Sequence, residues 1–196
     1  MLISDGDLES LIKSTKVLRR FTYRTRTFNS NPVDHWGRIV AVLETSARDT
    51  LEYLEIDDEE YMSDQPGICW IYEDQDVQYT GLLRHFSVLK KVRVDHPMFI
   101  HCEGVGDSAQ AKPQQLVTML PASVEELELT CHLIPERTAE KLFAGLGALK
   151  EQYVSRLRNI TFARGHWHHD AIWSACEEVG IAVEIETQSR SCLQFF

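Results

Sequence analysis

The stretch GHWHHDAIW holds the densest group of side chains that could do chemistry, namely His166, His168, His169 and Asp170. Imidazole and carboxylate groups at short spacing are typical ligands of transition metals. His166 and His168 share a face only in an extended chain, however, and no second ligand cluster is evident elsewhere in the sequence. We favour a polar loop in which Asp170 caps the following helix, with no bound metal or cofactor. The alternative is a metal-dependent enzyme that uses the three histidines.

Two cysteines stand beside histidines, as His101-Cys102 and Cys131-His132. A nucleophile and its base need side chains that converge, and sequence neighbours rarely provide that geometry. The sequence also contains no P-loop, GxSxG, HExxH or GxGxxG motif. We therefore predict that the protein is not an enzyme.

Composition limits the class of protein further. The chain has 196 residues, of which 43% are hydrophobic, and its net charge of −10 disfavours nucleic acid as a partner. The basic stretch 16–26 is interpreted as a strand with basic outward side chains, and a nucleic-acid patch is the weaker alternative. Five scattered cysteines, no long apolar run and no secretory leader favour a cytoplasmic or nuclear protein without a membrane anchor.

A spaced apolar triplet, at positions i, i+3 and i+5, recurs along the chain. LPASVEELELT contains one copy, in which Val124, Leu127 and Leu129 are the three residues. The intervals between copies run from 23 residues (157 to 180) to 38 residues (51 to 89), which is typical of repeat proteins. The first residues of the six copies are Leu18, Leu51, Leu89, Val124, Leu157 and Gly180.

Each triplet follows an apolar stretch with helical periodicity, so the predicted unit is a helix, a tight turn and a short strand. Pro121 should end the fourth helix early, and Gly180 should cap the last one. Successive units would pair their strands in parallel, because a helix supplies the long crossover that parallel pairing needs. The stretches lie within 8–17, 36–43, 82–89, 116–120, 142–154 and 172–179.

The residues between the apolar positions of each strand should face the other side of the sheet, because side chains alternate along a strand. On the first strand these residues are basic, and on the others they are mostly acidic. We predict that this face binds a protein partner and does no chemistry. The predicted contact residues are Arg20, Arg24, Tyr53, Glu55, Asp57, Lys91, Arg93, Asp95, Glu126, Glu128, Asn159, Glu184 and Glu186.

The segments TSARDTLEYLEIDDE, GLLRHFSVLKKVRVD and LVTMLPASVEELELT resemble the irregular leucine-rich repeats of fungal F-box and F-box-like proteins. RLRNITF and ACEEVGIAVEIE resemble the closing repeats. The resemblance covers nearly the whole chain and implies an α/β fold. The expected form is one domain over 1–196, an irregular leucine-rich-repeat solenoid of about six repeats. Its parallel sheet would be concave and its helices would lie on the convex side.

The same resemblance implies a part in recognising the substrate of a ubiquitin ligase, so that the partner is a ubiquitination substrate. The first predicted helix begins near Asp7, which leaves no room for an F-box. We therefore expect a fragment of a longer protein, or one that lacks the box, and we expect no binding of the ligase adaptor. Long connections at 57–80 and 96–113 could add contacts or be neutral insertions. A repeat fragment without a specific partner is the remaining alternative.

Overall fold

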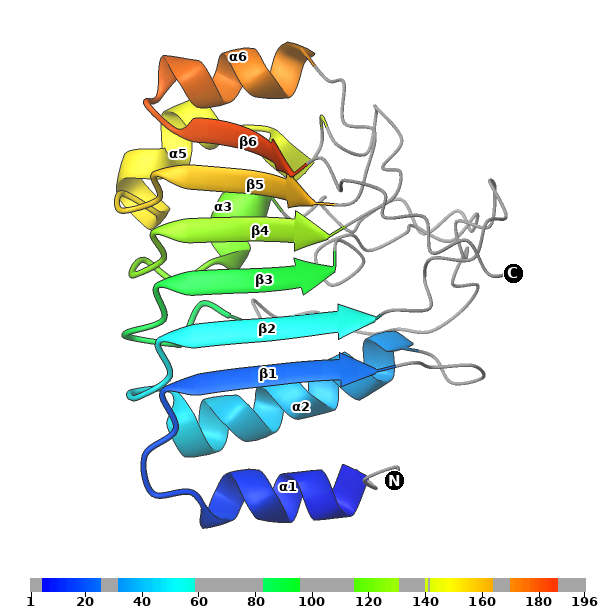
Figure 1. Cartoon of the computed structure of the whole chain (residues 1–196). Helices are drawn as coiled ribbons and strands as arrows, with labels where there is room; N and C mark the ends of the chain where they lie inside the picture. The colour runs from blue at the N-terminus through cyan, green and yellow to red at the C-terminus, as the bar shows by residue number, and fades with distance from the viewer. Residues whose placement is uncertain are drawn as a thin grey trace, which may run out of the picture.

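The computed structural model describes residues 5–25, 32–58, 83–95, 115–130, 140, 142–163 and 170–186. These residues form an α/β protein whose six strands make one parallel sheet (Figure 1). The strands lie in the sheet in the order in which they occur in the sequence. The strands are β1 (Arg20–Thr25), β2 (Tyr53–Asp58), β3 (Lys91–Asp95), β4 (Glu126–Thr130), β5 (Asn159–Ala163) and β6 (Ala182–Glu186).

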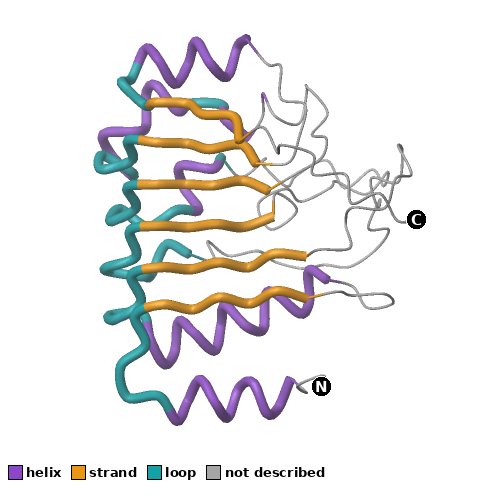
Figure 2. The backbone as a smooth tube through the Cα atoms, viewed as in Figure 1, coloured by secondary structure: helices purple, strands orange, loops and turns teal. Residues whose placement is uncertain are grey.

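A helix precedes every strand except β3 in the described residues, and none of the described helices covers the face of the sheet opposite the core (Figure 1). In Figure 1, α2, α3 and α5 lie behind the sheet, while α1 and α6 lie beyond its two outer strands. The turns that lead into the strands form a single column at the start of the strands (Figure 2). The helices are α1 (Asp5–Ser14), α2 (Pro32–Ala47), α3 (Leu116–Met119), α5 (Leu146–Tyr153) and α6 (Asp170–Glu178).

The predicted triplets form the core, and their register is confirmed. Leu127 pairs with Val92 on one side and with Ile160 on the other, so the second triplet positions align across the sheet. The third positions align in the same way. From β2 to β5 these side chains are almost completely buried, and each stabilises the fold by about 1.5–3 kcal/mol.

Local sequence explains where the helices begin and end. Pro32 is the first residue of α2, where its missing N–H is not needed. Pro121 follows the short α3, as predicted. Gly180, at φ 69°, ends α6 through two backbone hydrogen bonds: its own N–H donates to Glu177 (3.0 Å), and the N–H of Ile181 donates to Cys176 (2.9 Å). This is the Schellman arrangement, so the predicted glycine cap is confirmed.

Two details of the helices differ from the prediction. The apolar stretch before β3 is a turn from Leu83 onward, closed by a hydrogen bond from the Phe86 N–H to the Leu83 carbonyl (3.2 Å). Three apolar residues at spacing three suit a turn that buries its side chains as well as a helix, and Leu83, Phe86 and Leu89 are all buried. Within the apolar stretch 8–17, Leu8 and Ile12 are buried, but Leu11 is 58% exposed.

Hydroxyl groups tie neighbouring turns together at two equivalent positions. The Thr50 hydroxyl donates to the carbonyl of Leu18 (3.0 Å), and the buried Ser123 hydroxyl donates to the carbonyl of Leu89 (2.8 Å). Each hydroxyl belongs to the residue before a triplet, and each acceptor is the first triplet residue of the preceding unit. The units are therefore linked by side chains outside the sheet as well as by the strands.

Candidate protein interface

The face of the sheet opposite the core carries the side chains that alternate with the buried triplet residues. We call it the polar face. The strand register aligns its residues in rows across the sheet. The central row consists of Thr22, Glu55, Arg93, Glu128, Thr161 and Glu184, in the order of the strands.

Glu55 lies at the centre of a hydrogen-bonded network on this face. Arg24 on β1 donates to its Oε1 from Nη2 (2.9 Å) and Nε (3.1 Å), and the Tyr53 hydroxyl donates to Oε2 (2.8 Å). Thr22 adds a longer bond to Oε2 (3.5 Å), and the Nε atom of Arg93 lies 3.9 Å from Oε1. These neighbours leave Glu55 only 3% exposed.

The network determines how Glu55 and Tyr53 titrate. Burial acts to raise the pKa of Glu55, but hydrogen bonds from Tyr53 and Arg24 and the charges of Arg24 and Arg93 hold that pKa below its ordinary value. Burial and the hydrogen bond to Glu55 raise the pKa of the Tyr53 phenol. Glu55 is thus a stable anion that organises its donors and cannot act as a proton carrier near neutral pH.

Arg93 bridges the strands on either side of β3. Its Nη1 lies 3.2 Å from Oε1 of Glu128, while its Nε faces Glu55 without forming a hydrogen bond. The Glu128 side chain is 13% exposed. Burial raises the pKa of Glu128, the charge of Arg93 opposes that shift, and the charge of Glu186 adds to it. Glu128 is therefore incompletely neutralised, in contrast to Glu55.

Two further contacts join adjacent strands at the start of the polar face. Lys91 pairs with Glu126 at 2.8 Å, and this hydrogen bond is the main cause of a raised Lys91 pKa. The guanidinium of Arg20 lies 4.2 Å from the centre of the Tyr53 ring, in a cation–π arrangement. Most of the predicted contact residues on β1 to β4 thus contact one another.

The charges on the polar face alternate strand by strand. β1 carries Arg20 and Arg24 and β3 carries Lys91 and Arg93, whereas β2 and β4 carry carboxylates. Asp95, the last residue of β3, departs from this pattern. The residues directly before the strands continue the alternation and are joined by backbone hydrogen bonds of 2.7–2.9 Å; they are Arg19, Glu52, Lys90, Glu125 and Arg158. The alternation was not predicted from the sequence, although comparing the polar residues of one strand with those of the next could have found it.

The alternation fails over β5. The three polar-face residues of β5 are Asn159, Thr161 and Ala163, none of which is charged. Glu128 on one side and Glu184 and Glu186 on the other are therefore not separated by a cation. No ion pair is formed by Glu184 or Glu186 within the part of the chain that the structure describes.

Other predicted residues contribute less. Asp57 is buried at the end of β2, with 1% of its surface exposed, so it does not offer a contact surface. The backbone of Asp95 pairs with Thr130 at the end of β3. His166, His168 and His169 lie outside the described residues, as do the connection 96–113 and all but the first residues of 57–80.

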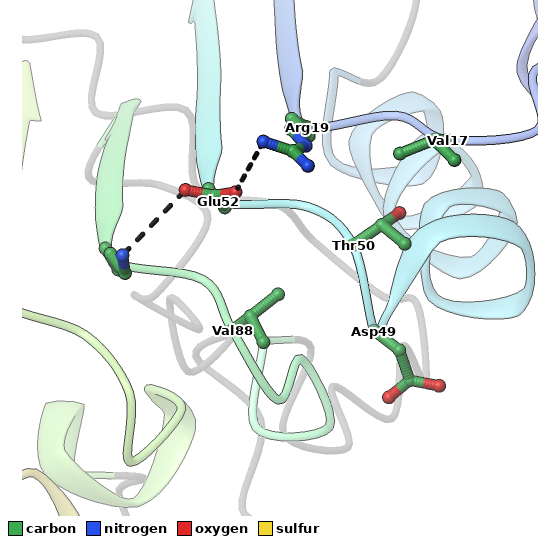
Figure 3. Close-up of a pocket in the computed structure, with 7 residues that line it drawn as sticks. Val17, Arg19, Asp49, Thr50, Glu52 and Val88 are labelled. Carbon is green, nitrogen blue, oxygen red and sulfur yellow. Dashed lines mark ion pairs between the residues drawn. The ribbon is translucent and has the colours of Figure 1, made fainter.

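A depression of about 240 Å³ lies where the turns enter β1, β2 and β3 (Figure 3). Glu52 occupies its rim, 3.9 Å from Arg19 and 3.8 Å from Lys90. The remaining lining residues are Val17, Asp49, Thr50 and Val88. Ligand sites usually enclose about 300–1,000 Å³. This hollow is smaller and four of its seven lining residues are charged, so it is a weaker candidate site than the polar face.

The described residues contain no group of three histidine, cysteine, aspartate or glutamate side chains that could hold a metal ion. Burial raises the pKa of the Cys176 thiol to about 11, which makes it a poor nucleophile at neutral pH. None of the helices placed by the structure has the length and apolar character needed to cross a bilayer.

Models of known protein families, curated proteins and solved structures give no match to this chain.

Proposed function

We propose that the chain is a non-enzymatic module that holds a protein partner on its polar face. The observation that carries this proposal is the face itself: six strands in fixed register present charged and polar side chains on a surface that no described helix covers. Alternating charges neutralise much of β1 to β4, while Arg20 at one side and Glu184 and Glu186 at the other stay available for a partner. Such a distribution orients a partner and speeds its encounter.

The finer proposal is a curved leucine-rich-repeat-like solenoid. A sequential parallel order places the crossovers on one face when all have the usual right hand. A helix is about 10 Å wide and neighbouring strands are about 4.8 Å apart, so one helix per strand would bend the sheet toward its bare face. The polar face would then be concave, which is the surface that repeat arrays use for partners. Within that proposal, the partner is a substrate of a ubiquitin ligase.

Comparative capture from a cell lysate tests the proposal. The variant carries Arg20→Glu, Glu184→Lys and Glu186→Lys on the polar face. A control with Glu177→Lys and Glu178→Lys on the exposed part of α6 changes the charge in the same direction. We expect proteins that the native chain and the control retain to be lost by the polar-face variant. Identical sets of captured proteins for all three chains would contradict an interface on this face.

A further inference from the structure

The interruption of the charge alternation over β5 has the properties of a site for a cation. We call it the β5 gap and define it by Glu128, Thr161, Glu184 and Glu186. In the central row, Arg93 lies between Glu55 and Glu128, but the next equivalent position is the short Thr161. Glu184 follows on β6, so Thr161 lies between two glutamates. Glu128 and Glu184 are two strand spacings apart, which is about 10 Å between their backbones.

The acids of the β5 gap are short of cations: Glu128 shares Arg93 with Glu55, and Glu184 and Glu186 form no ion pair with any residue that the structure describes. Burial is the main cause of the raised pKa of Glu128, and the charge of Glu186, on the other side of β5, adds to it. Arg158 is the basic residue of this strand, but it precedes Thr161 by three residues, or about 10 Å along the strand. It belongs to the row of turn residues, where its backbone N–H donates to Glu125 (2.9 Å).

Two buried oxygen atoms beside the gap add a second and independent observation. Thr130, which is 3% exposed, pairs with Ala163, and its Oγ1 has no hydrogen-bond partner among the described residues. The Oδ1 atom of Asn159, two residues before Thr161, is also buried and has no partner in the same part of the chain. Both residues share the face of Thr161, because alternate residues of adjacent in-register strands point the same way. Unpaired buried polar atoms are rare and call for a partner.

The chemistry of the gap selects the partner group. Its border consists of carboxylates and neutral oxygens that can accept hydrogen bonds, so it calls for a cation with several donors. The three acids do not converge closely enough to hold a metal ion, as no such group exists among the described residues. A guanidinium is planar, carries five N–H donors and reaches acceptors on two sides at once.

We propose that the β5 gap binds an arginine side chain of a separate protein partner, held between Glu128 and the two acids of β6. The arginine would supply the cation that the central row lacks at Thr161 and would continue the alternation of charge across the sheet. This inference rests on the proposed function, since it names the chemistry by which the polar face recognises its partner.

Titration of the full chain with N-acetyl-arginine methylamide, followed by amide NMR shifts, tests the site. The citrulline analogue serves as the uncharged isostere and the lysine analogue as a compact cation. We expect the arginine probe to shift amides of β4, β5 and β6, the lysine probe to bind at least about fivefold more weakly, and citrulline to do nothing. Equal binding of lysine and arginine, or shifts spread over all acidic surfaces, would overturn the assignment.

Substitutions locate the binding to the gap. The double substitution Glu184→Gln, Glu186→Gln should lower the affinity for the arginine probe about tenfold. The control Glu177→Gln, Glu178→Gln on α6 should leave that affinity unchanged. Thr161→Arg should supply the cation within the chain and so abolish binding of the probe. If the Thr161→Arg variant does not fold, the double glutamine variant remains the test. Undiminished probe binding by the glutamine variant would refute the site.

Two further experiments identify the source of the arginine and distinguish failure of the β5 gap from failure of the proposed function. A dimer that forms with rising concentration and is lost in the Glu184→Gln, Glu186→Gln variant would assign the arginine to a second copy and overturn a separate partner. Proteins captured from a lysate by the native chain are compared with those captured by the two variants. If capture is lost in the polar-face variant but kept in the Glu184→Gln, Glu186→Gln variant, the β5 gap is refuted and the proposed function is left intact. Loss of capture with both changes is the expected result.

Discussion

Arg93 lies between two glutamates that differ in how well they are neutralised. Glu55 receives hydrogen bonds from three side chains, so its charged form is favoured in the folded protein despite burial. Glu128 has Arg93 as its described ion-pair partner and is repelled by Glu186, so burial prevails and its pKa is raised. The number of donors that oppose the effect of burial therefore separates an anchoring carboxylate from one that still needs a cation.

Glu55→Gln is expected to lower the free energy of unfolding by about 2 kcal/mol at pH 7, because it removes charge-assisted hydrogen bonds from Arg24 and Tyr53. The folded-state pKa of Glu55 is lowered, so its stabilising contribution is full above the ordinary glutamate pKa of about 4.3. That contribution is lost as the pH falls through the folded-state pKa. Urea unfolding between pH 3 and 7 measures both effects, and an equal deficit at every pH would contradict the mechanism.

Glu128→Gln should behave in the opposite way. A raised pKa means that the folded state binds the proton more tightly than the unfolded state, so ionisation of Glu128 destabilises the fold as the pH rises through that range. The glutamine variant should thus be as stable as the native chain at pH 7, or more stable, and the difference should vanish in acid. The same urea series tests it, with Glu178→Gln on α6 as the charge-matched control. A loss as large as that of Glu55→Gln would be inconsistent with this account.

At the level of the elements, the turns contribute to holding the strands in register. Backbone hydrogen bonds begin one residue before the strands, and the hydroxyls of Thr50 and Ser123 reach the carbonyls of the preceding unit. Gly180 gives the last helix the one conformation that allows the chain to enter β6 directly. Changes in these short connections should therefore affect stability, as changes in the sheet do.

Ser123→Ala should cost about 1–3 kcal/mol, because Ser123 is buried and its removal takes a donor from the Leu89 carbonyl. Ser87→Ala is the matched control: this exposed hydroxyl contacts Asp49, so its loss should change stability by less than about 0.5 kcal/mol. Chemical unfolding of the two variants makes the comparison. Equal effects would mean that the bond between units contributes no more than a surface contact.

Gly180→Ala should destabilise the chain by about 1–2 kcal/mol, since φ is 69° and a side chain is disfavoured there even though no atom lies within 4 Å of the added carbon. Gly37→Ala, inside α2 and also without close neighbours, should instead stabilise by about 0.5–1 kcal/mol. Thermal unfolding distinguishes the two signs. A stabilising Gly180→Ala would disprove the requirement for a left-handed cap.

At the level of the whole molecule, the strands lie side by side in sequence order. Each inner strand has two neighbouring strands, and each outer strand has one. The burial pattern reflects this position. Val94 and Leu129 in the middle are completely buried, whereas Ile185 at the equivalent place on β6 is 36% exposed. Stability should consequently decline from the central strands toward the last one.

Hydrogen exchange should reveal that gradient. Amides of β3 and β4 are expected to be the slowest, and those of β6 to exchange at least about tenfold faster through opening of the terminal unit. Residue-resolved exchange by NMR measures the rates directly. One common rate for β3, β4 and β6 would instead indicate that the array opens as a single cooperative unit.

Much of this architecture could be predicted because the triplets alternate with period two, which determines both the strands and the side that each residue faces. Leu54, Val92 and Leu127 are paired as their positions in the triplets predicted. The turn at Leu83 could not be told from a helix by apolar spacing alone. The burial of Glu55 also escaped prediction, since it results from long side chains of neighbouring strands folding over one carboxylate.

Because the charge alternates from strand to strand, the loss of an even number of units has a different effect from the loss of an odd number. Removing the β3 unit would bring the acidic β2 against the acidic β4, whereas removing β2 and β3 together would set the basic β1 beside the acidic β4. Gains and losses of units in pairs would thus preserve attraction between neighbours, whereas loss of the β3 unit alone would set Glu55 against Glu128. A lineage of such chains should change length by even numbers of units, except next to a neutral strand such as β5, where an odd change is tolerated.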